Sequence, residues 1–97
     1  SYFIGILASA SRQWVQRLNI SGNVSTNTSA VHGIFIDGAQ YLNICTNVVA
    51  EVGTPSGWGI ILGANVSNGF VSLNTTQGYT NKVLSSGTNV TVASNGP

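Results

Sequence analysis

The sequence is poor in charge. Only five of its 97 residues are charged, namely Arg12, Arg17, Asp37, Glu51 and Lys82. Globular proteins carry about a quarter charged residues, so the depletion is roughly fivefold. A net charge of +1 lacks the basic footprint of a nucleic-acid-binding protein, and we expect no nucleic-acid partner. A hydrophobic content of 42% with almost no net charge is the opposite of the composition of a disordered tail.

Metal ligands and long apolar runs are also scarce. Cys45 is the only cysteine and His32 the only histidine, so the chain has no internal disulfide and no cysteine–histidine set for zinc. Two acids are too few for a calcium site, which needs six to eight oxygen ligands. We therefore expect no metal or cofactor, a structural role for His32 and a packing role for Cys45. The longest apolar run, Val48 to Val52, is interrupted by Glu51, so no membrane span of roughly 20 residues is predicted.

Residues that favour helices are few, whereas β-branched residues alternate with turn formers throughout. The composition predicts a single all-β domain over residues 1–97, with only Ser9 to Leu18 compatible with a short helix, a loop or a strand. The chain starts at Ser1 with an apolar stretch and no basic leader. Because a chain this short buries little surface, we expect it to be a piece of a larger protein or part of an oligomer.

What the sequence does contain is a repeat. Four segments end in an asparagine that follows an apolar residue by three positions, and these asparagines are Asn23, Asn47, Asn74 and Asn95, separated by 24, 27 and 21 residues. A second series of apolar segments, residues 3–7, 33–38, 59–64 and 82–87, precedes them. Turn formers such as Asp37-Gly38 lie between the two series. The predicted unit is strand, tight turn, strand, asparagine turn and an excursion of variable length.

This repeat predicts a right-handed parallel β-helix, a solenoid of about three to four coils. Three inward ladders of apolar side chains are expected: Ile4, Ile34, Ile60 and Val83; Leu18, Leu42 and Val90; Ile20, Ile44, Val71 and Val92. Asparagine suits the repeated turn because it tolerates the left-handed conformation and can hydrogen-bond its equivalent in the next coil. An antiparallel β-sandwich is the alternative, since it also produces short, evenly spaced strands.

Two segments resemble the coils of the pectate-lyase-like β-helix family, above all bacteriophage tailspikes and related appendages. They are His32–Gly38 (HGIFIDG) and Leu18–Asn23 (LNISGN), and the likeness extends from about Val15 to Asn95. The resemblance implies a homotrimer of parallel β-helices, exposed on the virion, that binds or depolymerises bacterial surface polysaccharide. It further implies that this chain is a C-terminal, structural part of a cleaved parent spike.

The two acids raise the alternative of a polysaccharide lyase or glycoside hydrolase. Such enzymes use one carboxyl group as acid and another as base or nucleophile, which makes Asp37 and Glu51 the weak catalytic candidates. The spacing does not fix the distance between them. The competing interpretation is that Asp37 forms a turn and that Glu51 is a solvated loop charge.

Aromatic side chains are the stronger candidates for ligand contact. Four of them fall at coil edges or in the excursions, namely Trp14, Tyr41, Trp58 and Tyr79. Exposed aromatic rings pack on the apolar faces of sugars, and amides and hydroxyls supply hydrogen bonds. The competing interpretation is that these rings cap the core or seal a subunit interface.

Overall fold

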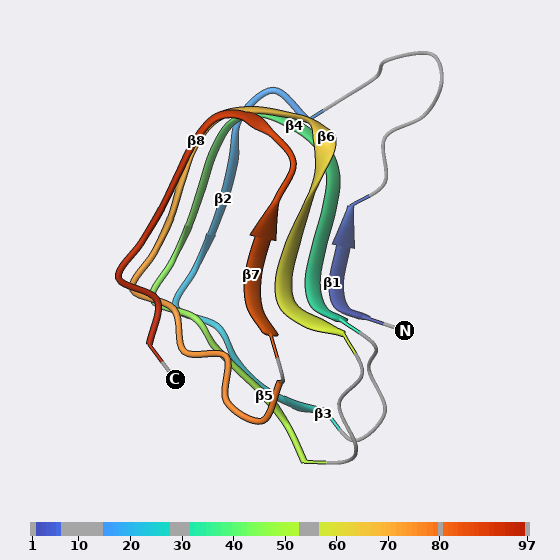
Figure 1. Ribbon diagram of the computed structural model, residues 1–97, viewed down its shortest axis with the longest axis vertical. Coiled ribbons are helices and arrows are strands. Elements are labelled where there is room, and N and C mark those ends of the chain that lie inside the picture. Colours follow the sequence, from blue (N-terminus) through green and yellow to red (C-terminus); the bar gives the residue numbers. More distant parts are fainter. Residues whose placement is uncertain (1, 7–14, 28–31, 53–56, 80, 97) are drawn as a thin grey trace.

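The computed structural model describes residues 2–6, 15–27, 32–52, 57–79 and 81–96 (Figure 1). The described residues form eight strands: β1 (Tyr2–Ile6), β2 (Leu18–Ser21), β3 (Val24–Asn27), β4 (His32–Cys45), β5 (Val48–Glu51), β6 (Trp58–Ser72), β7 (Asn81–Ser85) and β8 (Thr88–Ala93). They contain no helix, so the all-β prediction is confirmed. All pairings between these strands are parallel, and the antiparallel sandwich is therefore wrong.

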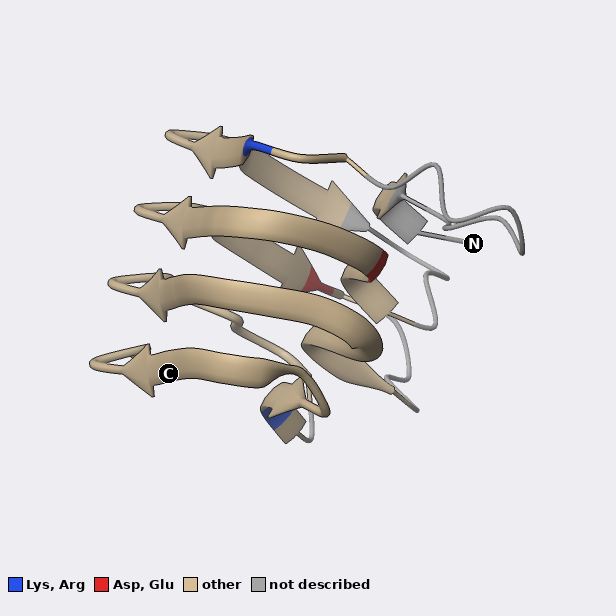
Figure 2. Cartoon of the chain, turned by 90° about the horizontal axis from the view of Figure 1, so that it is seen from above, with Lys and Arg blue, Asp and Glu red and all other residues tan. Residues whose placement is uncertain are grey.

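The strands lie on three faces, which the chain visits in the same order on four successive passes (Figures 1 and 2). The first face contains β1, the beginning of β4, the beginning of β6, and β7. The second contains β2, the end of β4, the end of β6, and β8. The third contains β3 and β5 and is extended by single bridges at Thr75 and Gly96. Each strand therefore pairs with its equivalents in the neighbouring passes.

Two details differ from the predicted unit. The tight turn between the first two strands is absent from β4 and β6, which bend and continue from the first face to the second. A register shift marks this corner, because Ile36 pairs with Leu62 but Gly38 pairs with Asn65. The variable excursions also begin as ordered structure, since the first residues of two of them form β3 and β5. Residues 9–14 of the stretch that was compatible with a helix lie outside the described residues.

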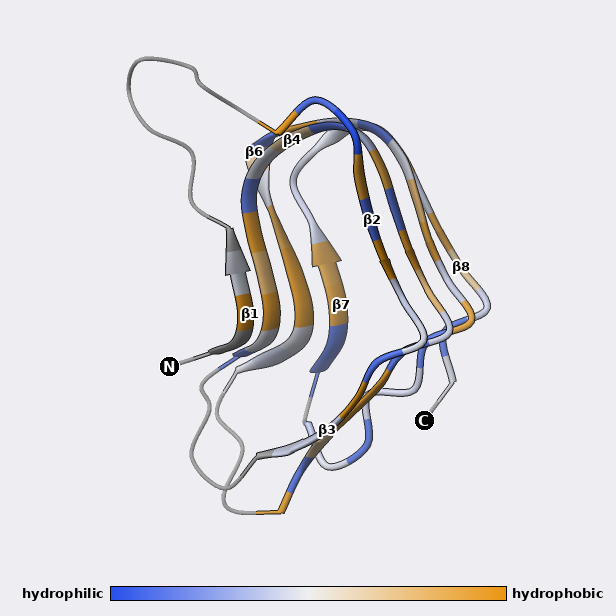
Figure 3. Ribbon diagram, turned by 180° about the vertical axis from the view of Figure 1, so that it is seen from behind, coloured by the Kyte–Doolittle hydropathy of each residue, from blue (hydrophilic) through white to orange (hydrophobic). Residues whose placement is uncertain are grey.

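The three predicted ladders are found in register. Ile34 pairs with Ile4 and Ile60, and Ile44 pairs with Ile20 and Val71. The ladder that contains Leu42 is interrupted by Gly69, which has no side chain. A side chain does not fit at this position, because a Cβ at Gly69 would lie 2.6 Å from the Leu42 carbonyl oxygen. Figure 3 shows the apolar residues recurring at the same level of neighbouring strands. Burial of these ladders provides the core.

The four repeated asparagines lie one above another and form a continuous hydrogen-bonded ladder. The backbone N–H of Asn47 and its Nδ2 both donate to Asn74 Oδ1, at 3.1 and 2.9 Å. Asn74 donates to Asn95 Oδ1 in the same way, and Asn23 to Asn47 Oδ1. Asn74 Nδ2 also donates to the Ile44 carbonyl, 3.0 Å away. Because Asn47 and Asn74 are buried, these bonds satisfy polar groups that water cannot reach.

The left-handed backbone conformation is found at different residues from those expected. It occurs one position before each ladder asparagine, at Gly22, Thr46, Leu73 and Ser94, with φ between 54° and 69°. A second set, Tyr41, Asn68 and Asn89, has φ near 57° at the corner before the second face. The asparagines of the ladder are therefore selected by their amide hydrogen bonds, and the residue before each one turns the chain.

We predict that Asn74→Ala lowers the free energy of unfolding by about 3–5 kcal/mol, because it leaves several buried polar groups unpaired. Chemical denaturation measures the loss. The control is Asn19→Ala, which removes an exposed amide and is expected to cost less than about 1 kcal/mol. Similar losses for the two variants would contradict a central role for the buried ladder.

We also predict that Leu73→Gly raises the free energy of unfolding by about 0.5–1 kcal/mol. The left-handed conformation costs an L-residue about 1–2 kcal/mol, and the greater entropy of unfolded glycine offsets only part of that gain. Leu73 is 62% exposed, so little core packing is lost. Leu73→Ala keeps the strained conformation and serves as the control in the same denaturation experiment. Equal stability of the two variants would contradict the prediction.

Candidate binding face

The outward side chains of the second face are uncharged and form rows across the strands. The strand registers align Asn19, Asn43, Phe70 and Thr91 in one row and Ser21, Cys45, Ser72 and Ala93 in the next. Asn43 Nδ2 donates to Asn19 Oδ1 at 2.9 Å, and Phe70 is 59% exposed. This face therefore presents linked amides, hydroxyl groups and an exposed aromatic ring.

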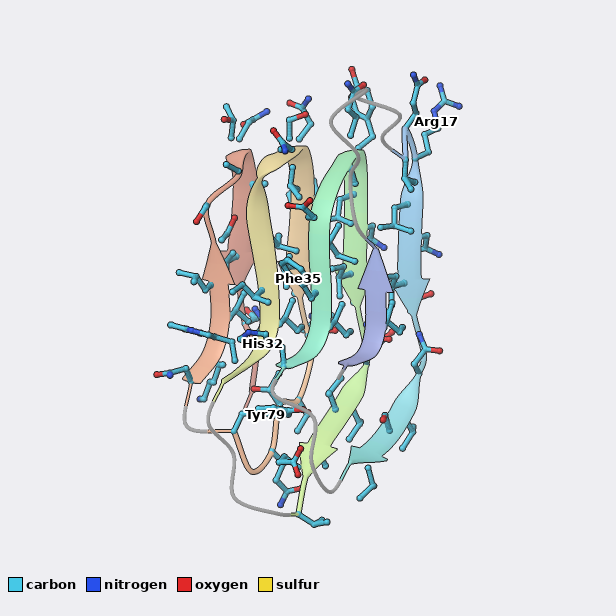
Figure 4. The ribbon with its side chains drawn as sticks, turned by 90° about the vertical axis from the view of Figure 1, so that its right-hand side faces the viewer. Arg17, His32, Phe35 and Tyr79 are labelled. Atoms are coloured by element: carbon cyan, nitrogen blue, oxygen red, sulfur yellow. The ribbon has the colours of Figure 1, made fainter. Side chains whose placement is uncertain are left out.

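The corner before this face adds a second aromatic ring and a cation. Tyr41, Asn68 and Asn89 occupy equivalent left-handed positions, and Asn89 Nδ2 donates to Asn68 Oδ1 at 2.7 Å. Arg17 directly precedes β2, as Tyr41 directly precedes Leu42, the residue paired with Leu18. Figure 4 shows Arg17 at the outer end of the stack of strands. Tyr41 is 62% exposed, and its ring is available to a partner.

These residues surround a shallow, open depression of about 460 Å³. Its lining residues are Arg17, Leu18, Asn19, Tyr41 and Asn43. We call these five residues together with Phe70 the binding face. The depression combines an aromatic ring, two amides that retain further hydrogen-bonding capacity and one guanidinium group. No described residue on the binding face is a carboxylate, so the arrangement suits recognition of a polar, neutral or anionic ligand.

Of the predicted aromatic residues that the structure describes, Tyr41 alone lies on the binding face. Tyr79 is 8% exposed and belongs to the core, so its expected position at an exposed edge is wrong. Trp58 is half-buried at the start of β6, and Trp14 lies outside the described residues. Sequence reasoning missed Phe70, although the alternation of Gly69, Phe70 and Val71 contains the signal: Val71 points inward, and its neighbour must point outward.

The structure does not bring the two carboxylates together. Glu51 ends β5 on the third face and is only 6% exposed, which corrects the interpretation of a solvated loop charge. Asp37 lies at the bend of β4, close to Gly63 of the next pass, where a Cβ would lie 3.0 Å from Asp37 Oδ1. β5 and the bend of β4 are at opposite ends of the long axis (Figure 1). The pair therefore lacks the close facing arrangement of a two-carboxylate glycosidase site.

His32 and Cys45 have local contacts. The backbone N–H of Trp58 donates to His32 Nδ1 at 3.0 Å, so the imidazole accepts a bond that fixes the start of β6 against β4. The His32 ring also lies 6.3 Å from the ring of Phe35 (Figure 4). Cys45 is half-buried on the outward side of β4, where its Sγ accepts from Asn43 Nδ2 at 3.3 Å, rather than packing in an apolar ladder.

Among the described ranges, no three His, Cys, Asp or Glu side chains gather as a metal site would require. The same ranges contain no helix with the length and apolar character needed to cross a membrane.

The different burial of the two tyrosines leads to a prediction about stability. Tyr79→Ala should lower the free energy of unfolding by about 3–5 kcal/mol, because it leaves a cavity in the core. Tyr41→Ala should change it by about 0.5 kcal/mol or less, since the ring is exposed. Thermal and chemical denaturation of both variants measure the difference. Comparable losses would contradict the assignment of Tyr79 to the core and Tyr41 to the surface.

Comparisons of the chain with models of protein families, with curated proteins and with solved structures find no match.

Proposed function

We propose that the chain is a right-handed parallel β-helix of four coils that serves as a structural and assembly segment of a trimeric bacteriophage tailspike or similar extracellular appendage. In this proposal the segment contributes to binding of bacterial surface polysaccharide. The observation that carries the binding role is the depression on the binding face, where exposed Tyr41 lies beside the bonded amides of Asn19 and Asn43.

The architecture is supported by the strand registers. Parallel pairing of every strand with its equivalents, four passes over three faces and inward ladders of like residues are the features of a solenoid. The asparagine ladder supports it further, because each coil offers the next one the same amide at the same position. The passes also differ in length between the first and second faces, since Ile6 and Leu18 are the equivalents of Ile36 and Leu42.

The binding face matches the chemistry of a glycan. The rings of Tyr41 and Phe70 offer flat apolar surfaces for the C–H faces of sugar rings. The amides of Asn19 and Asn43 offer donors and acceptors for hydroxyl groups, and the guanidinium of Arg17 can hold a sugar carboxylate through two hydrogen bonds. A single shallow site of this kind binds weakly. Three copies in a trimer would raise the apparent affinity for a repeating polymer through avidity.

The enzymatic alternative receives less support. Glu51 is buried on the third face, and Asp37 lies at the bend of β4 and does not line the depression, so neither joins the binding face. In this proposal the segment therefore contributes binding and assembly, and the two acids have no catalytic role. Full retention of depolymerase activity by the Asp37→Asn and Glu51→Gln variants of the parent spike would remove the alternative, and loss of activity in either would restore it.

We predict that Tyr41→Ala and Phe70→Ala each weaken glycan binding about tenfold, which corresponds to about 1.4 kcal/mol. The probes are purified capsular polysaccharides and O-antigens, both neutral and acidic, and affinity electrophoresis or calorimetry gives the dissociation constants. The control is Leu73→Ala, which removes an equally exposed apolar side chain outside the binding face. Absence of binding to every glycan, or equal effects of the three variants, would overturn the proposal.

A further inference from the structure

The outer side of the second face carries short ladders of asparagine amides. Asn43 in the second pass is the equivalent of Asn19 in the first, and Asn43 Nδ2 donates to Asn19 Oδ1 at 2.9 Å. The corner of the same face repeats this arrangement one level further along the stack, because Asn89 Nδ2 donates to Asn68 Oδ1 at 2.7 Å. In both pairs, the amide of the later pass occupies the oxygen of the earlier one.

Phe70 interrupts the ladder that begins with Asn19 and Asn43. It is the equivalent of Asn43 in the third pass, and its ring has no group that donates a hydrogen bond to an amide oxygen. Among the described residues, none donates to Asn43 Oδ1. Asn43 has described residues on both sides of it in the row, so the unused capacity of its oxygen follows from the residue at position 70.

The orientation of the Asn43 amide is fixed by two donated bonds. One goes to Asn19 Oδ1, and the other goes to Cys45 Sγ at 3.3 Å. A primary amide has two hydrogens to donate and one oxygen to accept, so these bonds use both hydrogens and leave the oxygen. Turning the amide over would bring the two Oδ1 atoms of Asn43 and Asn19 together with no hydrogen between them. At this position the binding face therefore offers an acceptor to a partner.

Two exposed aromatic rings lie close to this acceptor. Phe70 is the next residue of the row and is 59% exposed, and Tyr41 lines the same depression as Asn43 and is 62% exposed. Equivalent residues of neighbouring passes are about 4.8 Å apart, which is about the width of one sugar ring. A pyranose lying against Phe70 would therefore bring the hydroxyl groups at its edge within reach of Asn43 Oδ1.

We propose that Asn43 and Phe70 form a subsite for a neutral sugar, in which a sugar hydroxyl takes the place of the missing amide of the ladder and donates to Asn43 Oδ1. The C–H face of the same sugar packs on the ring of Phe70. This subsite rests on the proposed function and adds to it the group of the glycan that is recognised. A sugar whose hydroxyl at this point carries an acetyl or methyl group has no hydrogen to donate. It would leave the amide oxygen unpaired and bind more weakly.

The test compares two substitutions of Asn43. Asn43→Asp keeps an acceptor oxygen, whereas Asn43→Leu has a similar size and removes it. Neutral capsular polysaccharides and O-antigens are the probes, because a carboxylate at this position would repel an acidic glycan. We expect Asn43→Leu to bind them about tenfold more weakly than the wild type, and Asn43→Asp to stay within about threefold of it, as affinity electrophoresis measures. Asn65→Leu makes the same change at an exposed asparagine outside the binding face and should bind as the wild type.

A second measurement needs no variant. In the NMR spectrum of the wild-type chain, titration with the same neutral glycans should shift the side-chain amide signals of Asn43 and leave those of Asn65 in place. Circular dichroism and thermal denaturation show that the variants keep their fold, which is expected because the side chain of Asn43 is on the outer side of β4.

The outcomes separate this subsite from the proposed function. Equal losses for Asn43→Leu and Asn43→Asp would overturn the subsite, because binding would then depend on the Nδ2 hydrogens, and so would wild-type affinity of Asn43→Leu. The proposed function survives both results, since the wild-type chain still binds. Binding to acidic glycans alone would also overturn the subsite, because specificity would then depend on the Arg17 cation. Absence of binding to every glycan would overturn the proposed function and the subsite together.

Discussion

The structure depends on the hydrogen bonds that join each ladder asparagine to its equivalent in the next pass. A stacked parallel sheet needs a fixed register, since a shift of one residue would turn the apolar ladders outward. The side chain of Asn74 prevents such a shift by binding the Asn47 backbone, the Ile44 carbonyl and Asn95 at once. The bonds to the Asn47 backbone and to the Ile44 carbonyl are buried, so the alternative registers leave polar groups unpaired and are unfavourable.

The in-register stacking of equivalent strands explains the low content of charged residues. In a stack of equivalent strands, like residues lie over like, and a charged residue repeated in every pass would face its own charge. Asparagine, serine and threonine avoid this repulsion and still form hydrogen bonds, as Asn43 does with Asn19 on the outside. The low charge therefore reflects the architecture. Among the described residues of the binding face, it leaves the guanidinium of Arg17 and the rings of Tyr41 and Phe70 as the groups that differ from the surrounding amides and hydroxyls.

Much of the fold was predictable from the sequence, and part of the candidate site was. The alternation of apolar and polar residues and the asparagine spacing predicted the ladder partners of Ile34 and Ile44, because side-chain alternation is a local property of a strand. The same alternation places Phe70 outward. Tyr79 was misplaced because its burial depends on how a short excursion folds back over the third face, which no local pattern encodes. Glu51 was misplaced for the same reason, since β5 gains its place only by pairing with β3.

By itself the sequence determined the all-β class, the in-register apolar ladders and the stacking of the asparagines. These features follow from the alternation of apolar and polar residues and from the recurrence of asparagine, both of which are visible in the sequence itself. The tertiary structure alone decided that β4 and β6 run through the first corner, that the residue before each asparagine turns the chain, and that Arg17 and Tyr41 border one depression. Those features depend on backbone conformation and on contacts between passes about 24 residues apart. At the corners, the packing of one pass on the next selects the backbone conformation, and the intrinsic preference of the individual residue does not.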